Sequence, residues 1–501
     1  MDTTPFLRPD GTLDLARVRV DPGLAFNLPA AFAARRAILP LCVIEGEAWT
    51  AMADPGDSAA IDLLSQRAAL PVHPLPAARA EILAHLKAVY GDLSADDSVS
   101  PFAAGADGTG AAPADDAVLA VESVLRAAVL RRASDIHVDP ERGGIRIRLR
   151  VDGTLEDFQR LPSEALPALV SRVKVLARLD IAERRAPQDG AFVWHRPFIS
   201  AGSVGGTYDV RVATLPTRFG ERVTLRLLET NGARLGLGSL GMNAAHAAAF
   251  ERVLASPHGL LLLTGPTGSG KTTTLYAAIR HMIDNAPLNV LTVEDPVEYE
   301  IAGVAQCEVD STDKVSFNDA LRSLLRHDPD VIMIGEIRDA ESLDIAVKAA
   351  LTGHLVLSTL HTNDSVSAVL RLADMGLEPH LAAATLRLSV AQRLVRRLCP
   401  VCRSPVAVTA AEAAAFARPE LEGRTAYVPG RCLACAGRGY AGRMGLFEFM
   451  QPDDEVCTAI AASAPYGELR AMLARKGFRT LLDDAIVKSD ASAIALRDVI
   501  A

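Results

Sequence analysis

The sequence predicts an α/β fold, and three observations support this prediction. Short apolar strands alternate with helical stretches from about residue 236 onward, which is the pattern of a parallel sheet. A GxxxxGK[ST] loop follows one of these strands at residues 265–272. Acidic residues follow two of the other strands, at the edge where a parallel sheet binds its ligands.

Length and charge limit the possible classes of protein. The chain has 501 residues, enough for about three domains, and 49% of them are hydrophobic, so buried cores are expected. The formal charge of -9 is unsuited to a nucleic-acid partner, and we expect none. The apolar run 259–265 falls far short of the ~18 residues of a membrane span, and the first residues lack the features of a secretory signal. We therefore expect a cytoplasmic protein.

The pattern along the chain indicates four segments. Residues 1–90 form a small mixed domain, with a helix near 77–90, and residues 91–116 are small, acidic and predicted to be a flexible linker. An α/β domain is expected over 117–235 and a larger one over 236–501, with an insertion at 398–436.

A set of arginines repeats along three predicted strands of the second domain. After a helix at about 117–132, residues 145–151, 208–213 and 223–227 alternate apolar and polar side chains. The sequence predicts a sheet with one cationic side, suited to phosphate or carboxylate recognition, although a plain solvated face is the alternative. The arginines are Arg146, Arg148, Arg150, Arg211, Arg222 and Arg226.

The GxxxxGK[ST] loop is the strongest motif. It follows the apolar strand 260–263 and precedes a helical stretch at about 271–283, the context that a phosphate-binding loop requires. Glycines allow backbone N–H groups to face phosphates, Lys271 reaches the β- and γ-phosphates, and Thr272 can hold Mg²⁺. The predicted nucleotide-binding residues are Gly265, Pro266, Thr267, Gly268, Ser269, Gly270, Lys271 and Thr272.

Two carboxylates and a histidine follow neighbouring strands. Glu336 follows the strand 331–334, Glu294 follows 290–293, and His361 follows a strand at 355–357. A pair of acids beside a phosphate loop suits a nucleotide hydrolase, with one acid polarising water and one acting through Mg²⁺. A histidine there could contact a γ-phosphate. Turn-capping acids and a structural histidine are the alternatives.

Four cysteines form two CxxC pairs, whereas Cys42, Cys307 and Cys457 are isolated. Four thiolates in this pattern predict a closed structural Zn²⁺ site, with iron–sulfur ligation or unpaired thiols as alternatives. Arginines just upstream indicate a partner-docking face or a solvated helix side. The ligands would be Cys399, Cys402, Cys432 and Cys435, and the arginines are Arg387, Arg393, Arg396 and Arg397.

Several of these runs resemble a known family. LRHDPDVIMIGEIRD at 325–339 resembles the signature of the type II secretion and type IV pilus assembly ATPases. VEDPVEYE resembles their aspartate box, TGHLVLSTLHTND their histidine box, and the CxxC pairs their metal-binding insertion. ASDIHVDP and the segment with Arg211 and Arg226 resemble the domain before the motor, and ADPGD with AVYG resembles the N-terminal module. The resemblance covers roughly residues 40–500.

The resemblance implies a RecA-like motor domain, preceded by a small PAS-like α/β domain and a small N-terminal domain that docks on inner-membrane secretion platform proteins. It implies a homo-hexamer at the cytoplasmic face of the inner membrane, attached through partners, with ATP, Mg²⁺ and Zn²⁺. Carried over, Glu294 and Glu336 act on water and Mg²⁺, and His361 senses the γ-phosphate. Arg211 and Arg226 stabilise charge in the transition state.

Within the family, the tetracysteine insertion resembles the secretion and pilus-extension branches rather than the retraction branch. The short first domain favours type II secretion, because pilus-extension members usually carry a longer N-terminal region. We find no Arg-Leu-Gly-type repeat of cyclic-di-GMP-binding modules in it. The expected activity is ATP hydrolysis that powers pseudopilus assembly and protein export, and the alternative is type IV pilus extension.

Overall fold

The computed structural model describes residues 2–91, 114–196, 206–229, 235–309 and 316–499. The chain divides into two compact units. Unit 1 comprises residues 1–232, 398–404 and 429–441, and unit 2 comprises residues 233–397, 405–428 and 442–501. Most of the predicted linker at 91–116 lies outside the described residues. No helix among the described residues is long and apolar enough to cross a membrane.

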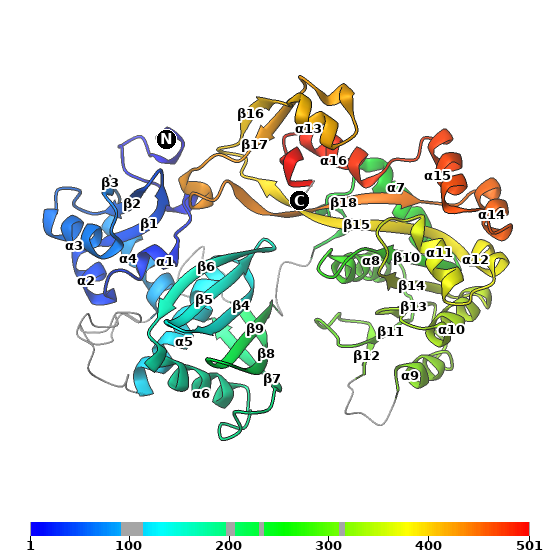
Figure 1. Cartoon of the computed structure of the whole chain (residues 1–501), viewed down its shortest axis with the longest axis horizontal. Coiled ribbons are helices and arrows are strands. Elements are labelled where there is room, and N and C mark those ends of the chain that lie inside the picture. Colours follow the sequence, from blue (N-terminus) through cyan, green and yellow to red (C-terminus); the bar gives the residue numbers. More distant parts are fainter. Residues whose placement is uncertain (1, 92–113, 197–205, 230–234, 310–315, 500–501) are drawn as a thin grey trace. The chain divides into compact units, whose positions relative to one another are not determined.

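The N-terminal part of unit 1 is a small three-stranded sheet covered by helices (Figure 1). The strands pair in the order β1-β2-β3, and the predicted helix near 77–90 is confirmed as α4, which buries Ile82, Leu86 and Val89. The elements are α1 (Pro22–Ala25), α2 (Ala30–Arg36), β1 (Ile38–Ile44), β2 (Glu47–Met52), α3 (Ser58–Ala68), β3 (Val72–Pro76) and α4 (Arg79–Tyr90).

The second part of unit 1 is an antiparallel six-stranded sheet in the order β6-β5-β4-β9-β8-β7, with helices α5 and α6. The three strands predicted from alternation are confirmed as β5, β8 and β9, and Ile147, Val210 and Val223 on their apolar faces are fully buried. The elements are α5 (Ala114–Leu130), β4 (Ala133–Glu141), β5 (Gly144–Val151), β6 (Thr154–Leu161), α6 (Leu166–Leu176), β7 (Gln188–Arg196), β8 (Gly206–Thr217) and β9 (Gly220–Glu229).

The opposite face of this sheet is not simply cationic, which corrects the expectation from the arginine pattern. Acids on β4, β6 and β8 lie among the arginines, because β4 is placed between β5 and β9. The face is therefore a lattice of opposite charges. The pairs are Arg146–Asp157, Arg148–Asp139, Arg150–Asp135, Arg211–Asp209, Arg222–Asp139 and Arg226–Asp135.

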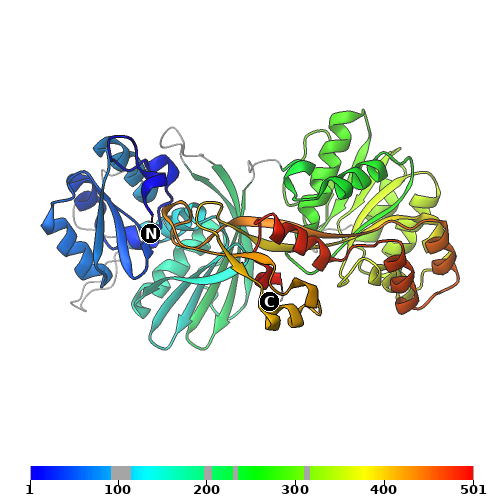
Figure 2. The ribbon, with the colours of Figure 1, turned by 90° about the horizontal axis from the view of Figure 1, so that it is seen from above.

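Unit 2 contains a seven-stranded sheet in the order β12-β11-β13-β14-β10-β15-β18 (Figures 1 and 2). The strand before the phosphate loop, β10, pairs in parallel with both β14 and β15. Its elements up to β14 are α7 (Ala244–Leu254), β10 (Gly259–Thr264), α8 (Lys271–Asn285), β11 (Val290–Glu294), β12 (Ala305–Glu308), α9 (Phe317–Leu324), β13 (Val331–Ile334), α10 (Ala340–Leu351) and β14 (Leu355–Leu360).

Helices cover both faces of this sheet. Leu260 and Leu262 belong to a core shared with α9 and α10, whereas Leu261 and Leu263 belong to a second core shared with α7 and α8. This alternation explains why β10 is buried at every position and carries four consecutive leucines. The predicted α/β fold with a parallel sheet is confirmed.

The remaining elements follow β14. They are α11 (Ser367–Asp374), α12 (Pro379–Thr385), β15 (Leu386–Leu398), β16 (Ser404–Ala407), α13 (Ala410–Ala415), β17 (Thr425–Val428), β18 (Tyr440–Met450), α14 (Asp454–Ala461), α15 (Tyr466–Arg475) and α16 (Leu481–Asp490). The four arginines at 387–397 lie on the strand β15, so the reading of a helix side is wrong.

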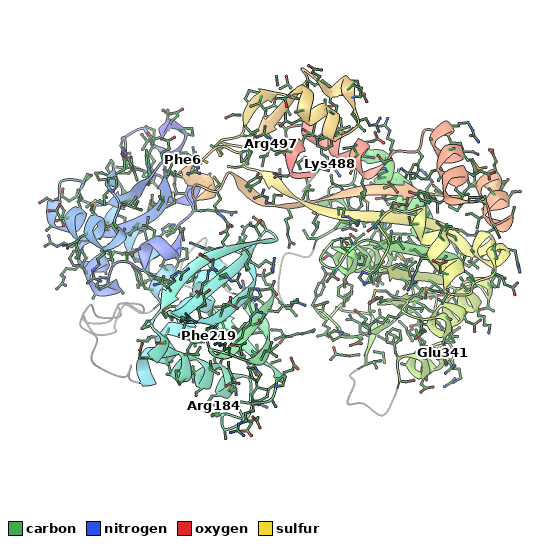
Figure 3. All side chains as sticks on the ribbon, in the orientation of Figure 1. Phe6, Arg184, Phe219, Glu341, Lys488 and Arg497 are labelled. Carbon is green, nitrogen blue, oxygen red and sulfur yellow. The ribbon has the colours of Figure 1, made fainter. Side chains whose placement is uncertain are left out.

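A buried ion pair ties α16 to β18. Lys488, labelled in Figure 3, contacts Asp484 and donates to the Gly445 carbonyl at 2.6 Å. Asp484 also accepts the Phe447 N–H at 2.9 Å. Burial lowers the pKa of Lys488, and the Asp484 carboxylate opposes this effect. The charge of each side chain is thus compensated chiefly by the other.

We predict that Lys488→Ala lowers the free energy of unfolding by about 3–5 kcal/mol, because it leaves the Asp484 carboxylate buried and unpaired. Lys348→Ala is a matched control, since Lys348 also pairs with an aspartate at i,i+4, Asp344, but these side chains are 68% and 56% exposed. That change should cost about 0.3–0.5 kcal/mol. Urea unfolding followed by circular dichroism measures both, and equal effects would contradict the assignment.

Candidate nucleotide and metal sites

The phosphate loop begins where β10 ends. Gly265, Gly268 and Gly270 adopt φ values of +149°, +78° and +88°, which favour glycine. A Cβ at Gly265 would lie 2.4 Å from the Gln392 carbonyl oxygen, whereas one at Gly268 would meet no atom within 4 Å. The loop is therefore packed tightly at its base on β15 and open at its tip, where a phosphate would enter.

Lys271 starts α8, whose first N–H groups have no acceptors within the helix and favour an anion. Its ammonium donates to the carbonyls of Gly265 and Pro266 at 2.7 and 3.1 Å. Burial lowers the pKa of Lys271, and the nearby Glu336 carboxylate opposes this effect. These two carbonyls bind the Lys271 ammonium, the group that the sequence predicts to contact the β- and γ-phosphates.

Ser269 supplies a second indication of a ligand-binding site. Its side-chain oxygen is buried and has no hydrogen-bond partner among the described residues. Buried hydroxyl groups normally have a partner, so this oxygen is available to a ligand in the loop. Thr272, the predicted Mg²⁺ contact, is partly exposed one residue after Lys271.

Glu336 and His361 meet at the carboxyl ends of β13 and β14. The Nε2 atom of His361 lies 3.1 Å from Oε1 of Glu336. The other carboxylate oxygen of Glu336 accepts from Arg338 at 3.2 Å, and Arg338 also donates to Asp295 at 3.0 Å. The Glu336 side chain is 28% exposed and that of His361 46% exposed, so both are accessible. The structure thus brings Lys271, Glu336 and His361 together.

Glu294 has different surroundings. The residue is 2% exposed, and its carboxylate accepts hydrogen bonds from Tyr276, Thr292 and Gln306. Burial, and then the bond to Glu294, raises the pKa of Tyr276, which keeps this phenol a donor. Because this carboxylate is buried, the expected role of Glu294 on water requires a change that exposes it.

Two residues of β15, Gln392 and Arg393, border the phosphate loop, a position that the sequence motifs did not predict. Gln392 accepts from Thr274 on α8 at 2.8 Å. Arg393 donates to the Asn363 carbonyl at 3.0 Å, and its Nη1 would lie 3.0 Å from a Cβ at Gly265. Burial lowers the pKa of Arg393, and its charge helps to lower that of Lys271. The parallel pairing of β15 with β10 is the feature that would have identified Gln392 and Arg393.

The segment after His361 is anchored at both ends. Thr362 exchanges hydrogen bonds with Thr264 at the end of β10, at 2.6 and 2.8 Å. The buried carboxylate of Glu448 on β18 accepts from the backbone and hydroxyl of Ser365, at 2.9 and 2.7 Å. Glu448 was not predicted from the sequence, because only the folded sheet brings β18 to this segment.

Arg211 and Arg226 belong to unit 1. Arg226 donates to Asp135 at 3.2 Å, with its side chain 63% exposed, and Arg211 lies 3.7 Å from Asp209. Each of the two predicted charge-stabilising arginines therefore has an acidic neighbour within its own sheet.

The four predicted metal ligands converge in unit 1. Their sulfurs all lie within 4.8 Å of one another, and three pairs are 3.7–3.8 Å apart. An ion with four sulfurs at about 2.3 Å in a tetrahedron separates them by about 3.8 Å, so this spacing fits one ion. The Gly439 N–H donates to the Cys435 sulfur at 3.1 Å, as expected for a thiolate ligand.

A model of the type II/IV secretion system protein family matches residues 113–501, and a model of the MshEN domain matches residues 4–96. The type II secretion system protein E of Dickeya dadantii is 47% identical over 349 residues, which cover 69% of this chain and 68% of that protein. The type IV pilus assembly ATPase PilB of Myxococcus xanthus is 38% identical over 504 residues, covering 97% and 88%.

Solved structures share the fold. The ATPase DotB of Legionella pneumophila matches with a TM-score of 0.55 and 24% identity, over 76% of this chain and 94% of that one. The ADP-bound pilus retraction motor PilT matches with a TM-score of 0.51 and 25% identity, over 75% and 95%. The RecA-like fold predicted from the resemblance is thereby confirmed. This chain belongs to the type II/IV secretion system protein family and is an ATP hydrolase.

Proposed function

We propose that the chain is a hexameric ATPase that works at the cytoplasmic face of the inner membrane and powers pseudopilus assembly and protein export. The observation that carries the proposal is the meeting of Lys271, Glu336 and His361 at one edge of the sheet, in a chain with type II secretion relatives at 45–47% identity. Platform proteins of the secretion system are the proposed partners of the N-terminal domain, and no nucleic acid is required.

In the proposed reaction, the ATP phosphates bind the loop 265–272, and Lys271 leaves the carbonyls of Gly265 and Pro266 to bind them. Thr272 would help to hold Mg²⁺, which would neutralise phosphate charge when bound. Glu336 is the more accessible acid and is suited to polarise water, with His361 beside it to contact the γ-phosphate. We keep Glu294 as the second acid and propose Arg211 and Arg226 as the stabilisers of transition-state charge.

We also propose that the tetracysteine site holds Zn²⁺. Four sulfurs at single-ion spacing leave no open position, which is the arrangement of a structural site. Such an ion would hold together two chain segments, around 399–402 and 432–435, that share little regular structure.

Type IV pilus extension is a second candidate, and a specific observation favours it. PilB of Myxococcus xanthus aligns with 97% of this chain, whereas the type II protein E of Dickeya dadantii aligns with 69%. The short first domain therefore does not exclude a pilus ATPase. The higher identity of the type II secretion relatives keeps secretion as the first proposal.

Deleting the gene distinguishes these candidates. We expect exported proteins to disappear from the culture medium while surface pili remain, because the motor of one system should not serve the other. The wild-type gene should restore export, and a Lys271→Ala gene should not. Loss of pili with intact export would favour the second candidate, and an unchanged phenotype in both assays would contradict both.

We predict different effects for two changes at the nucleotide site. Lys271→Ala should remove nucleotide binding, because the phosphates lose their main cation. Glu336→Gln should retain binding and lower ATP turnover by roughly 10²–10⁴-fold, the usual contribution of a general base. Fluorescent-nucleotide titration and a phosphate-release assay measure the two quantities.

Glu341→Gln is the matched control for Glu336→Gln. Glu341 lies five residues further on, at the exposed start of α10, where it pairs with Arg322. Its substitution should leave turnover unchanged. Normal turnover of the Glu336→Gln variant would remove Glu336 from the mechanism.

We predict that the purified chain contains about one zinc ion and that Cys399→Ser loses it, because a structural site needs all four thiolates. Nucleotide binding should persist, since the phosphate loop belongs to the other unit. Cys457→Ser is the control, as Cys457 is a free cysteine outside the cluster. Elemental analysis in reducing buffer measures the zinc, and zinc-free wild-type protein would refute the site.

A further inference from the structure

The tetracysteine knuckle, defined as residues 398–404 and 429–441, groups with a different unit from the strands that precede and follow it. It joins the end of β15 to the start of β18, two strands of unit 2, yet its residues cluster with unit 1. Figures 1 and 2 both show this segment beside the N-terminal domain. The contacts between them explain the grouping.

Backbone groups of the tetracysteine knuckle and of the N-terminal domain approach each other closely. The Arg19 N–H donates to the Leu433 carbonyl at 3.0 Å. At Gly437, where φ is +75°, a Cβ would lie 2.6 Å from the carbonyl oxygen of Val43, at the end of β1. Leu433 is completely buried, in one hydrophobic core with Leu41 and Ile44 of β1. The knuckle is thus part of the N-terminal domain's own core.

A row of ion pairs also connects the knuckle to the N-terminal domain. Arg438 of the knuckle forms an ion pair with Glu156 on β6. Arg131, at the end of α5, lies 4.0 Å from Glu156 and donates through Nε to Asp21 of the N-terminal domain at 3.0 Å. These four side chains link the knuckle, the six-stranded sheet and the N-terminal domain.

The Arg19 side chain is half-buried beside the knuckle. Around it lie Cys399 and Arg438 of the knuckle, and Arg132 and Asp152 of the six-stranded part of unit 1. A change of this side chain therefore acts on the contact from the N-terminal side.

We propose that the tetracysteine knuckle is a metal-dependent clasp that docks the chain's own N-terminal domain. The inference rests on the proposed zinc site and goes beyond it, because a structural ion could equally stabilise a knuckle with no docking role. Loading orders the Leu433 and Gly437 turns that meet Arg19 and Val43. Loss of the ion releases the N-terminal domain from the knuckle.

Hydrogen exchange of the full-length chain tests the clasp, read at the amide of Arg19. In zinc-loaded wild-type protein this amide should be protected. Removing zinc with a chelator should raise its exchange roughly tenfold or more, the change expected when a local opening becomes easier by about 1.4 kcal/mol. The amides of β1 and β2, which pair with each other, should keep their protection.

Two glycine variants separate docking from metal binding. Gly437→Ala should raise Arg19 exchange, because the new methyl group meets the Val43 carbonyl. Gly442→Ala is the control, since Gly442 has a similar φ of +82° but no atom within 4 Å of a Cβ, and exchange should not change.

Charge reversal at Arg19 changes the N-terminal side of the contact and leaves every residue of the knuckle unchanged. Arg19→Glu should loosen the amides of residues 431–438, whereas Arg17→Glu should not, because Arg17 is 64% exposed and pairs with Asp14. If the Arg19 amide of zinc-loaded protein stays protected after chelation, the clasp is overturned and the zinc site stands. The same holds if the Arg19 amide stays protected in Gly437→Ala and the amides of residues 431–438 stay protected in Arg19→Glu. Protein purified without zinc, with Arg19 protected, overturns the zinc site and the metal dependence together.

Discussion

The site depends on one constraint, the parallel pairing of β10 with β14 on one side and β15 on the other. Parallel strands end at the same edge, so Gly265, His361 and Arg393 are brought to one place although they are far apart in sequence. Pairing of β13 with β14 adds Glu336. The chemistry follows from this register, because Glu336 and His361 lie within two residues of the ends of β13 and β14.

Side-chain packing fixes the register of β10 in the sheet. Alternate leucines of β10 enter two separate cores, so a shift by one residue would exchange every side chain between the α9–α10 side and the α7–α8 side. Hydrogen bonds between Thr264 and Thr362, and between Glu448 and Ser365, then hold the segment that carries His361. This anchoring holds the backbone beside His361 in place, whereas the Lys271 side chain has to leave its two carbonyls when a nucleotide binds.

Local patterns predicted much of this arrangement. The phosphate loop, the strands before Glu294, Glu336 and His361, and the cysteine pairs are short motifs whose residues are adjacent in the chain. Contacts between distant segments could not be predicted in the same way. The burial of Glu294 depends on Tyr276 and Gln306 from other elements, and the arginine face depends on acids carried by neighbouring strands. For Arg393 and its neighbouring arginines, a helix side was one of two interpretations, because a run of arginines has no clear strand period, and the structure places them on β15.

Steady-state ATP turnover of the purified full-length chain, measured over a range of protein concentrations with sizing of each sample, tests the central claim most directly. A hexameric secretion ATPase predicts magnesium-dependent turnover without nucleic acid, rising as the hexamer forms. Turnover that appears only after addition of DNA or RNA, or equal turnover per chain in monomer and hexamer, would contradict it.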